Sequence, residues 1–258
     1  EFGLQLRPFI IENDAAYYHA RGRRERRADW KTVNKAFGLQ GEESGKPAGA
    51  FWDQAVVGLL GKLSPAERDE LDGANSFSTP ELNRLDRLSL RRAVEMAGLS
   101  ENAIEYLFSL FGVGTLQHSA LTEHLREELQ EVWTRPFQEI VGGMSRLPEA
   151  LLGALRSAPM GGCEVVALSQ SESGVVAIYR ENGGRELKRQ DGDFMLCTIP
   201  LPALSRLEVE PAFSAEKRRA IAGVFYESSS KILLPTSTRV WETVDGIHGG
   251  SSATDMLI

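Results

Sequence analysis

The 258-residue sequence is poor in the residues that form disulfides and metal sites, because it contains only two cysteines and four histidines. Cys163 and Cys197 lie in separate apolar stretches without metal-ligand spacing, so we predict buried thiols and no disulfide framework. His118 and His124 are six residues apart, which places them on different faces of a helix. The sequence therefore predicts no metal site.

Long apolar runs and an excess of basic residues are also missing. No apolar stretch reaches the roughly 18 residues of a membrane-spanning helix, and the first residues do not resemble a cleavable leader. The net charge of -7 and the pI near 5.3 disfavour an anionic partner surface. We therefore expect a soluble protein, cytoplasmic or secreted, that binds neither nucleic acid nor membrane.

Familiar catalytic motifs are absent as well. The sequence has no G-x-G-x-x-G, no P-loop, no H-E-x-x-H and no G-x-S-x-G. Its 42% hydrophobic and 25% charged residues are typical of a soluble globular protein, and its length allows one large domain or two smaller ones. Composition and motifs alone support no more than a soluble α/β domain.

Hydrophobic periodicity divides the chain into helical and strand-rich parts. Residues 1–14 alternate like a half-buried strand. Helical patterns cover 90–96 and 103–110, with Gly98 ending the first helix and Ser100 capping the second, and another amphipathic helix covers 147–155. After it the period changes to two, and the turn-separated runs "CEVVALSQ", "GVVAIYREN", "RELKRQ", "DFMLCTIP" and "KILLPTSTRVW" are predicted strands. The expected fold class is α+β or α/β, with a β-meander and a helical insertion.

Four longer stretches carry a resemblance to a known family. They are "PFQEIVGGMSRLPEALLGAL", "DFMLCTIPLPALSRLEVEP", "KILLPTSTRVWE" and "GIHGGSSATD". In this order they resemble the flavin-dependent amine oxidase family, and its L-amino-acid oxidase branch in particular. The resemblance implies part of a two-domain flavin amine oxidase fold, an FAD-binding sheet plus substrate-domain strands. It implies four segments: a substrate-domain strand at 1–14, a helical domain at 15–130, part of the FAD-binding domain at 131–225, and substrate-domain strands at 226–258.

The resemblance also implies FAD as cofactor and a set of residues that contact it. Gly142 and Gly143 would let the backbone approach the cofactor without a Cβ. Val165 would contribute only its main chain to the adenine, although core packing explains that valine equally well. The remaining implied contacts are Met144, Cys197, Thr198, Ile199 and Trp241.

Lys231 is the implied catalytic residue, because it matches a lysine that holds a water beside the flavin in many family members. An ammonium directly before Ile232 is unusual at the start of an apolar strand. The alternative is an edge-strand lysine that reaches solvent. Glu127 and Glu227 stand where venom-type members have basic residues, so they are the candidate substrate-binding residues for a cationic side chain. Surface glutamates are the alternative for both.

The family's N-terminal βαβ dinucleotide unit, its substrate-carboxylate arginine and its C-terminal flavin-binding segment are not matched. The resemblance therefore implies the middle of an oxidase, whose partners are an amino acid, dioxygen and the missing N- and C-terminal segments, with a homo-oligomer as the complete enzyme. Three functions stay open: an L-amino-acid oxidase portion, a monoamine or polyamine oxidase portion, and a non-catalytic binding module.

Overall fold

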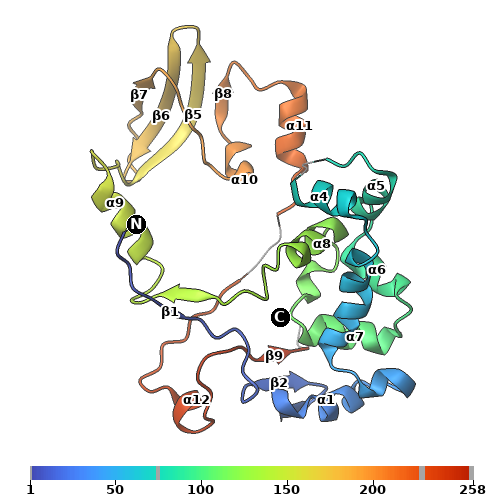
Figure 1. Ribbon diagram of the computed structural model, residues 1–258. Coiled ribbons are helices and arrows are strands. Elements are labelled where there is room, and N and C mark those ends of the chain that lie inside the picture. Colours follow the sequence, from blue (N-terminus) through green and yellow to red (C-terminus); the bar gives the residue numbers. More distant parts are fainter. Residues whose placement is uncertain (1, 74–75, 227–229, 256–258) are drawn as a thin grey trace. The chain divides into compact units, whose positions relative to one another are not determined.

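The computed structural model describes residues 2–73, 76–226 and 230–255 (Figure 1). The chain divides into two compact units, one formed by Gly3–Arg146 with Thr236–Ile258 and the other by Leu147–Pro235. The two units are described separately. The expected division at 14, 130 and 225 remains a prediction.

A bundle of short helices forms the core of the first unit. The bundle consists of α1 (Trp30–Ala36), α2 (Ala48–Trp52), a π-helix (Asp53–Val57), α3 (Gly58–Leu60), α4 (Pro65–Gly73), α5 (Pro80–Asp86), α6 (Leu90–Met96), α7 (Glu101–Leu110) and α8 (Leu121–Leu129). The short helix α12 (Val240–Thr243) belongs to the same unit but buries no residue. Leu71, Leu82, Leu90, Leu107 and Leu125 are fully buried where the bundle helices meet. Full burial of such a side chain contributes about 1.5–3 kcal/mol, so these contacts stabilise the bundle.

The two helices predicted at 90–96 and 103–110 are confirmed as α6 and α7. Ser100 caps α7, because its hydroxyl accepts a hydrogen bond from the Ala103 amide at 3.2 Å. Gly98 has a φ of +77°, a left-handed conformation that ends α6 and that glycine adopts without strain. Local signals therefore set both helix boundaries.

Among the described residues, five short strands complete the first unit. β1 (Leu6–Pro8) pairs antiparallel with β4 (Gln138–Ile140), and a second sheet has the order β3 (Arg23–Arg26), β2 (Tyr17–Ala20), β9 (Ala253–Thr254). The half-buried strand expected over 1–14 is wrong in extent and burial, because only β1 forms and all three of its residues are exposed. A two-stranded ribbon buries neither face by itself.

A cluster of charged and aromatic side chains ties the first residues of this unit to its last ones. The Tyr17 hydroxyl donates a hydrogen bond to Asp245 Oδ1 at 2.7 Å, and the Arg24 guanidinium lies 3.8 Å from the centre of the Tyr17 ring. Arg24 also pairs with Asp245 at 3.4 Å. Basic residues of this hairpin thus contact acids and rings of the same chain.

The second unit contains a four-stranded sheet in the order β7 (Lys188–Gly192), β6 (Gly174–Glu181), β5 (Cys163–Ser171), β8 (Glu208–Glu210). β5, β6 and β7 form an antiparallel meander, as the sequence predicts, and β8 pairs parallel with β5. The unit's helices are α9 (Arg146–Ala154), α10 (Leu201–Leu204) and α11 (Ala215–Gly223). The predicted helix at 147–155 is therefore present.

Two of the predicted strands do not form. Residues 193–200 are irregular, and the side chains of Phe194 and Leu196 are 95% and 90% exposed. Residues 231–239 are also irregular, with Leu233 88% exposed, and 240–243 form the helix α12. A strand requires a hydrogen-bonding neighbour, and within the described ranges no neighbour pairs with either segment. The prediction of these two strands was wrong because it used apolar composition alone and did not consider a pairing partner.

Buried His124 on α8 makes the stability of the first unit sensitive to pH. Ser119 Oγ donates to the Leu116 carbonyl, so it accepts from His124 Nε2–H at 2.6 Å, an arrangement that suits a neutral imidazole. Burial lowers the pKa of His124 below its ordinary value of 6.5, and Glu127 and Glu123 oppose part of that shift. Because the unfolded chain then takes up a proton first, the free energy of unfolding is expected to fall as the pH drops below 6.5.

Denaturant unfolding at about pH 7.5 and about pH 5.5 measures this effect, since most carboxyl groups stay ionised over that window. His124→Gln should lose stability at the higher pH and show a smaller difference between the two pH values. An unchanged pH difference in the variant would contradict the role given to His124.

Candidate functional site

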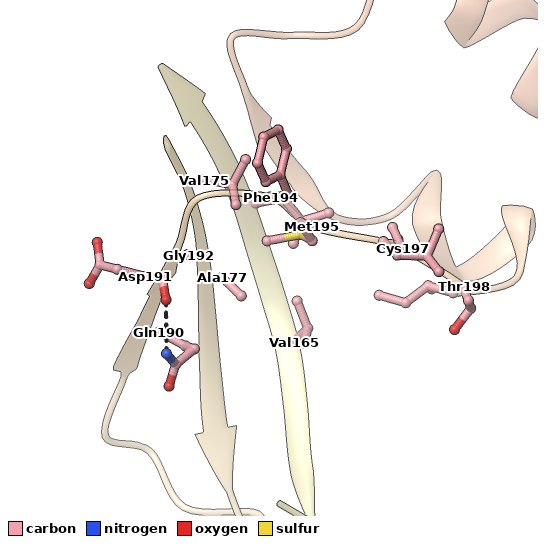
Figure 2. Close-up of a pocket in the computed structure, with 13 residues that line it drawn as sticks. Val165, Val175, Ala177, Gln190, Asp191, Gly192, Phe194, Met195, Cys197 and Thr198 are labelled. Carbon is pink, nitrogen blue, oxygen red and sulfur yellow. Dashed lines mark hydrogen bonds between the residues drawn. The ribbon is translucent and has the colours of Figure 1, made fainter. Parts of the chain in front are cut away.

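A mainly apolar hollow of about 340 Å³ lies on the sheet of the second unit. Its walls come from β5, β6, the end of β7 and the irregular segment that follows β7. Figure 2 shows this segment passing the strands, with Phe194 and Met195 near Val175, and with Cys197 and Thr198 farther along it. The hollow is lined by Val165, Leu168, Val175, Ala177, Gln190, Asp191, Gly192, Phe194, Met195, Leu196, Cys197, Thr198 and Ile199.

Glycines at the edge of the meander allow the close backbone approach that shapes this hollow. Gly174 begins β6 with a φ of +138°, and a Cβ there would lie 2.7 Å from the Gly192 carbonyl oxygen. A larger residue at Gly174 would therefore push the end of β7 away. Within β7, the Gln190 side-chain amide donates to the Asp191 carbonyl at 2.9 Å, close to where the crossing segment begins.

The hollow contains little acid–base machinery. Its one carboxylate, Asp191, accepts hydrogen bonds from the Arg189 guanidinium, and these hold the pKa of that carboxyl below its ordinary range. Most of the other lining side chains are apolar, so the hollow suits a flat, weakly polar group. Such a site can bind and orient a group that carries its own chemistry.

The open edge of β5 supplies backbone polar groups beside the hollow. β8 pairs with β5 only from Ala167 to Ser169, whereas β6 pairs with β5 from Cys163 onward. On the β8 side, the described residues therefore place no strand next to Val165. Backbone groups that point to this side are available to a ligand.

The structure brings four of the predicted cofactor residues together. Val165 lies on β5, and Cys197, Thr198 and Ile199 lie on the segment that crosses the sheet, and all four line the hollow. Val165 lies more than 30 residues before Cys197 in the sequence. Pairing of the meander strands, and not a local motif, therefore brings Val165 close to the crossing segment. Their contacts with the cofactor remain predictions.

The other predicted cofactor residues belong to the first unit. Gly142 and Gly143 form the turn between β4 and α9 with φ values of +91° and +97°, and the Gly143 amide donates to the Ile140 carbonyl at 3.0 Å. Met144 is 65% exposed in the same turn. Trp241 lies on α12 and is 40% exposed. The positive φ values of Gly142 and Gly143 are a local reason for glycine at both positions. The described structure does not place these residues relative to the hollow.

Lys231, the predicted catalytic residue, and Glu127, one of the two predicted substrate residues, lie outside the hollow. Lys231 is exposed in an irregular segment of the second unit, and no ion pair involves it in the ranges that the structure describes. Glu127 is half-buried on α8 and accepts a hydrogen bond from Trp133 Nε1 at 3.0 Å. Trp133 in turn stacks on Phe137 with ring centres 5.9 Å apart. Glu227 lies outside the described residues.

Several lining residues were missed by reasoning from the sequence. Val175 and Ala177 lie on β6 and face the hollow together with Gln190 of β7. The alternating pattern of "GVVAIYREN" indicated a strand but not which of its faces would meet the crossing segment. Met195 belongs to the stretch "DFMLCTIP", which carries part of the family resemblance. Its position two residues before the predicted contact Cys197 was the signal that could have identified it.

Comparisons with known proteins identify the family to which this chain belongs. Residues 1–257 match the family described as flavin containing amine oxidoreductase. The chain belongs to this family, and FAD is its cofactor.

Relatives named L-amino-acid oxidase match nearly the whole chain but only part of their own length. The protein from Vipera ammodytes ammodytes is 28% identical over 262 residues, covering 99% of this chain and 51% of the relative. The protein from Gloydius halys is 29% identical over 260 residues, with 99% and 49% covered, and that from Siganus canaliculatus is 28% identical, with 98% and 46% covered. The chain thus spans about half the length of these relatives.

Solved structures of putrescine oxidase share the fold. A redesigned putrescine oxidase matches with a TM-score of 0.55 at 16% identity, covering 86% of this chain and 47% of the other. Wild-type putrescine oxidase bound to putrescine matches with a TM-score of 0.53 at 17% identity and the same coverage. The expected class, a mixed α+β portion of the amine oxidase fold, is confirmed.

The residues present fit part of an FAD molecule. Aliphatic walls accept a flat ring, and the open β5 edge beside Val165 offers backbone donors and acceptors for ring nitrogens. A hollow of about 340 Å³ is near the lower end of the range for ligand pockets, so it suits one ring system better than a whole dinucleotide.

Two further properties concern metals and membranes. Within the described ranges, no cluster of histidine, cysteine and acidic side chains has the arrangement needed to hold a metal ion. Among the same residues, no helix has the length and apolar character to cross a membrane.

Proposed function

We propose that this chain is the middle portion of an FAD-dependent L-amino-acid oxidase. The complete enzyme would convert an L-amino acid, water and dioxygen into a 2-oxo acid, ammonia and hydrogen peroxide. The observation that carries the proposal is the match of proteins named L-amino-acid oxidase to 98–99% of the chain. The mainly apolar hollow on the β5–β7 meander supports it with a site for part of the cofactor.

A polyamine or monoamine oxidase portion is the second candidate, because the solved structures that match are putrescine oxidases. That likeness is at 16–17% identity and concerns the fold, whereas the L-amino-acid oxidases are 27–29% identical. We therefore prefer the amino-acid substrate. An arginine that pairs with a substrate carboxylate would distinguish the two candidates, because only an amino-acid substrate has that carboxylate.

In the proposed mechanism the chain's own residues bind and orient, while the bound FAD supplies the redox chemistry. Val165 would hold the adenine through backbone groups at the open β5 edge. Cys197, Thr198 and Ile199 would line the nucleotide half, and Gly142 and Gly143 would let the turn before α9 approach closely. Met144 and Trp241 are proposed to contact the cofactor as well.

Lys231 would act in the oxygen half of the reaction. Its exposed ammonium group has no recorded ion pair in the described part of the chain, so its charge is available to a bound water or to dioxygen. Positive charge stabilises the negative charge that develops as dioxygen accepts electrons. The exposed apolar residues that follow it, such as Leu233, would be covered in the complete enzyme.

Glu127→Gln and Glu227→Gln are expected to lower kcat/KM for arginine and lysine more than for leucine and phenylalanine in the complete enzyme. Each removes negative charge that favours a cationic side chain, with an effect of about 1–3 kcal/mol for a partly desolvated pair. At Glu127 the glutamine amide oxygen can still accept the Trp133 N–H, so this variant separates charge from positioning. Steady-state kinetics across the four substrates measures the difference.

Glu128→Gln is the matched control, because Glu128 lies on the same helix and accepts an indole N–H from Trp52 at 2.6 Å. It should leave the substrate preference unchanged. Equal losses of kcat/KM for all four substrates in the Glu127→Gln variant would mean that Glu127 has a structural role and does not select the substrate.

The chain purified by itself is expected to be colourless, inactive and prone to aggregation. The second unit exposes large apolar side chains, among them Phe194, Phe225 and Leu233, at 82–95%. Absorbance spectroscopy, a peroxide assay and light scattering test the three properties. A yellow, active and monomeric preparation would contradict the proposal that further segments are needed.

The proposed function is tested by co-expressing the chain with the flanking segments of an L-amino-acid oxidase. The proposal predicts co-purification, bound flavin, and peroxide release with an L-amino acid but not with putrescine. Release with putrescine alone would favour the second candidate. A soluble complex that neither binds flavin nor releases peroxide would favour a binding module.

A further inference from the structure

A second hollow, of about 290 Å³, lies within the helical bundle of the first unit. Residues of the π-helix, α3, α5 and α6 line it. Its floor is apolar, because Ala55, Leu85 and Ala93 are all nearly fully buried there, and Leu59 and Leu88 extend the same surface. This floor suits a short hydrocarbon chain or a small ring.

The rim of this hollow carries a net positive charge. Lys62, Glu81 and Arg84 all contribute to its lining. Glu81 and Arg84 neutralise each other, because Arg84 Nε and Nη2 donate to the two carboxylate oxygens of Glu81 at 2.8 Å and 2.6 Å. In the ranges that the structure describes, Lys62 makes no ion pair. One uncompensated ammonium group therefore remains at the mouth of an apolar hollow.

The π-helix shapes the wall next to that ammonium group. Residues Asp53–Val57 form this single π-turn between α2 and α3, and its Gln54 side chain donates to the Ala97 carbonyl at the end of α6 at 3.0 Å. This bond fixes one rim of the hollow, while Ala55 keeps the floor open with its small side chain. A π-turn within an α-helical segment is often found at a functional site.

We propose that this hollow binds a small amphipathic carboxylate, with its apolar tail on the floor formed by Ala55, Leu85 and Ala93 and its carboxylate paired with Lys62. The apolar floor selects the tail, and the net charge of the rim selects an anion over a cation. The site involves none of the residues assigned to the flavin or the amino acid. It is therefore independent of the proposed oxidase function.

Octanoate is the probe, and ligand-observed NMR titration of the 258-residue chain at low protein concentration measures its dissociation constant. We expect saturable binding of octanoate and at least about fivefold weaker binding of octylammonium, because only the anion can pair with Lys62. Lys62→Met keeps an apolar stem and should weaken octanoate binding about fivefold. Lys35→Met removes another exposed lysine from the same unit, on α1, and should leave binding unchanged.

Lys62→Glu changes the net charge of the rim from positive to negative, so it should reverse the preference of the hollow for an anion. This variant should lose octanoate binding and bind octylammonium more tightly than the unaltered chain does. The proposal is overturned if octanoate shows no saturable binding, or if Lys62→Met and Lys62→Glu bind octanoate as the unaltered chain does. Because Lys62 is exposed, both variants are expected to fold, and circular dichroism verifies this.

Discussion

Lys231→Met is expected to slow the reaction of the reduced enzyme with dioxygen by at least about tenfold, which corresponds to about 1.4 kcal/mol. Methionine keeps the length and the apolar stem of lysine but removes the ammonium group. Negative charge develops when dioxygen accepts electrons, whereas no comparable anion forms when the substrate gives up its hydride. The anaerobic half-reaction with the amino acid should therefore change much less.

Stopped-flow measurement of the two half-reactions in the complete enzyme separates these effects. Lys217→Met is the matched control, since Lys217 lies on α11 of the same unit with its ammonium near the Phe213 ring. It should leave both rates unchanged. If Lys231→Met oxidises at the normal rate and only its stability falls, Lys231 is a surface lysine of the irregular segment.

Leu107→Ala is expected to destabilise the helical bundle by about 2–5 kcal/mol. Leu107 lies on α7 and is completely buried in the core of the first unit, so the truncation removes apolar contacts and leaves a cavity. Leu116→Ala is the matched control, because Leu116 is 38% exposed in the same unit. It should cost less than about 1 kcal/mol.

Denaturant unfolding monitored by far-UV circular dichroism compares the two variants, because most helices belong to the first unit. Equal and small effects of both substitutions would mean that the bundle is not packed around Leu107. The same experiment shows whether the bundle unfolds in a transition of its own.

Features with local causes could be predicted from the sequence. Ser100 and Gly98 fixed the boundary between α6 and α7 through a side-chain cap and a left-handed turn. The meander of β5 and β6 followed from a period of two and a turn at Gly174. Each of these elements depends on neighbours within a few residues of it in the chain, or on a hairpin partner.

Features that depend on distant partners were predicted less well. The apolar runs that contain Leu196 and Leu233 have strand composition, but a strand forms only where another strand offers hydrogen bonds. For the same reason Val165 and Cys197 could be chosen by resemblance, whereas Ala177, on the opposite hairpin strand, could not be assigned to the hollow. Which residues share a hollow depends on pairing register, and a single sequence does not specify it directly.

We propose that the hollow on the β5–β7 meander holds part of the FAD, and the flavin content of an Ala177→Phe variant shows whether it does. Ala177 lines the hollow, so a phenyl ring there would fill space that the cofactor needs. Ala220→Phe, on exposed α11 of the same unit, is the matched control. In the complete enzyme we expect normal flavin per chain for Ala220→Phe and a loss of most flavin for Ala177→Phe, with both variants folded. Full flavin content in folded Ala177→Phe would contradict it.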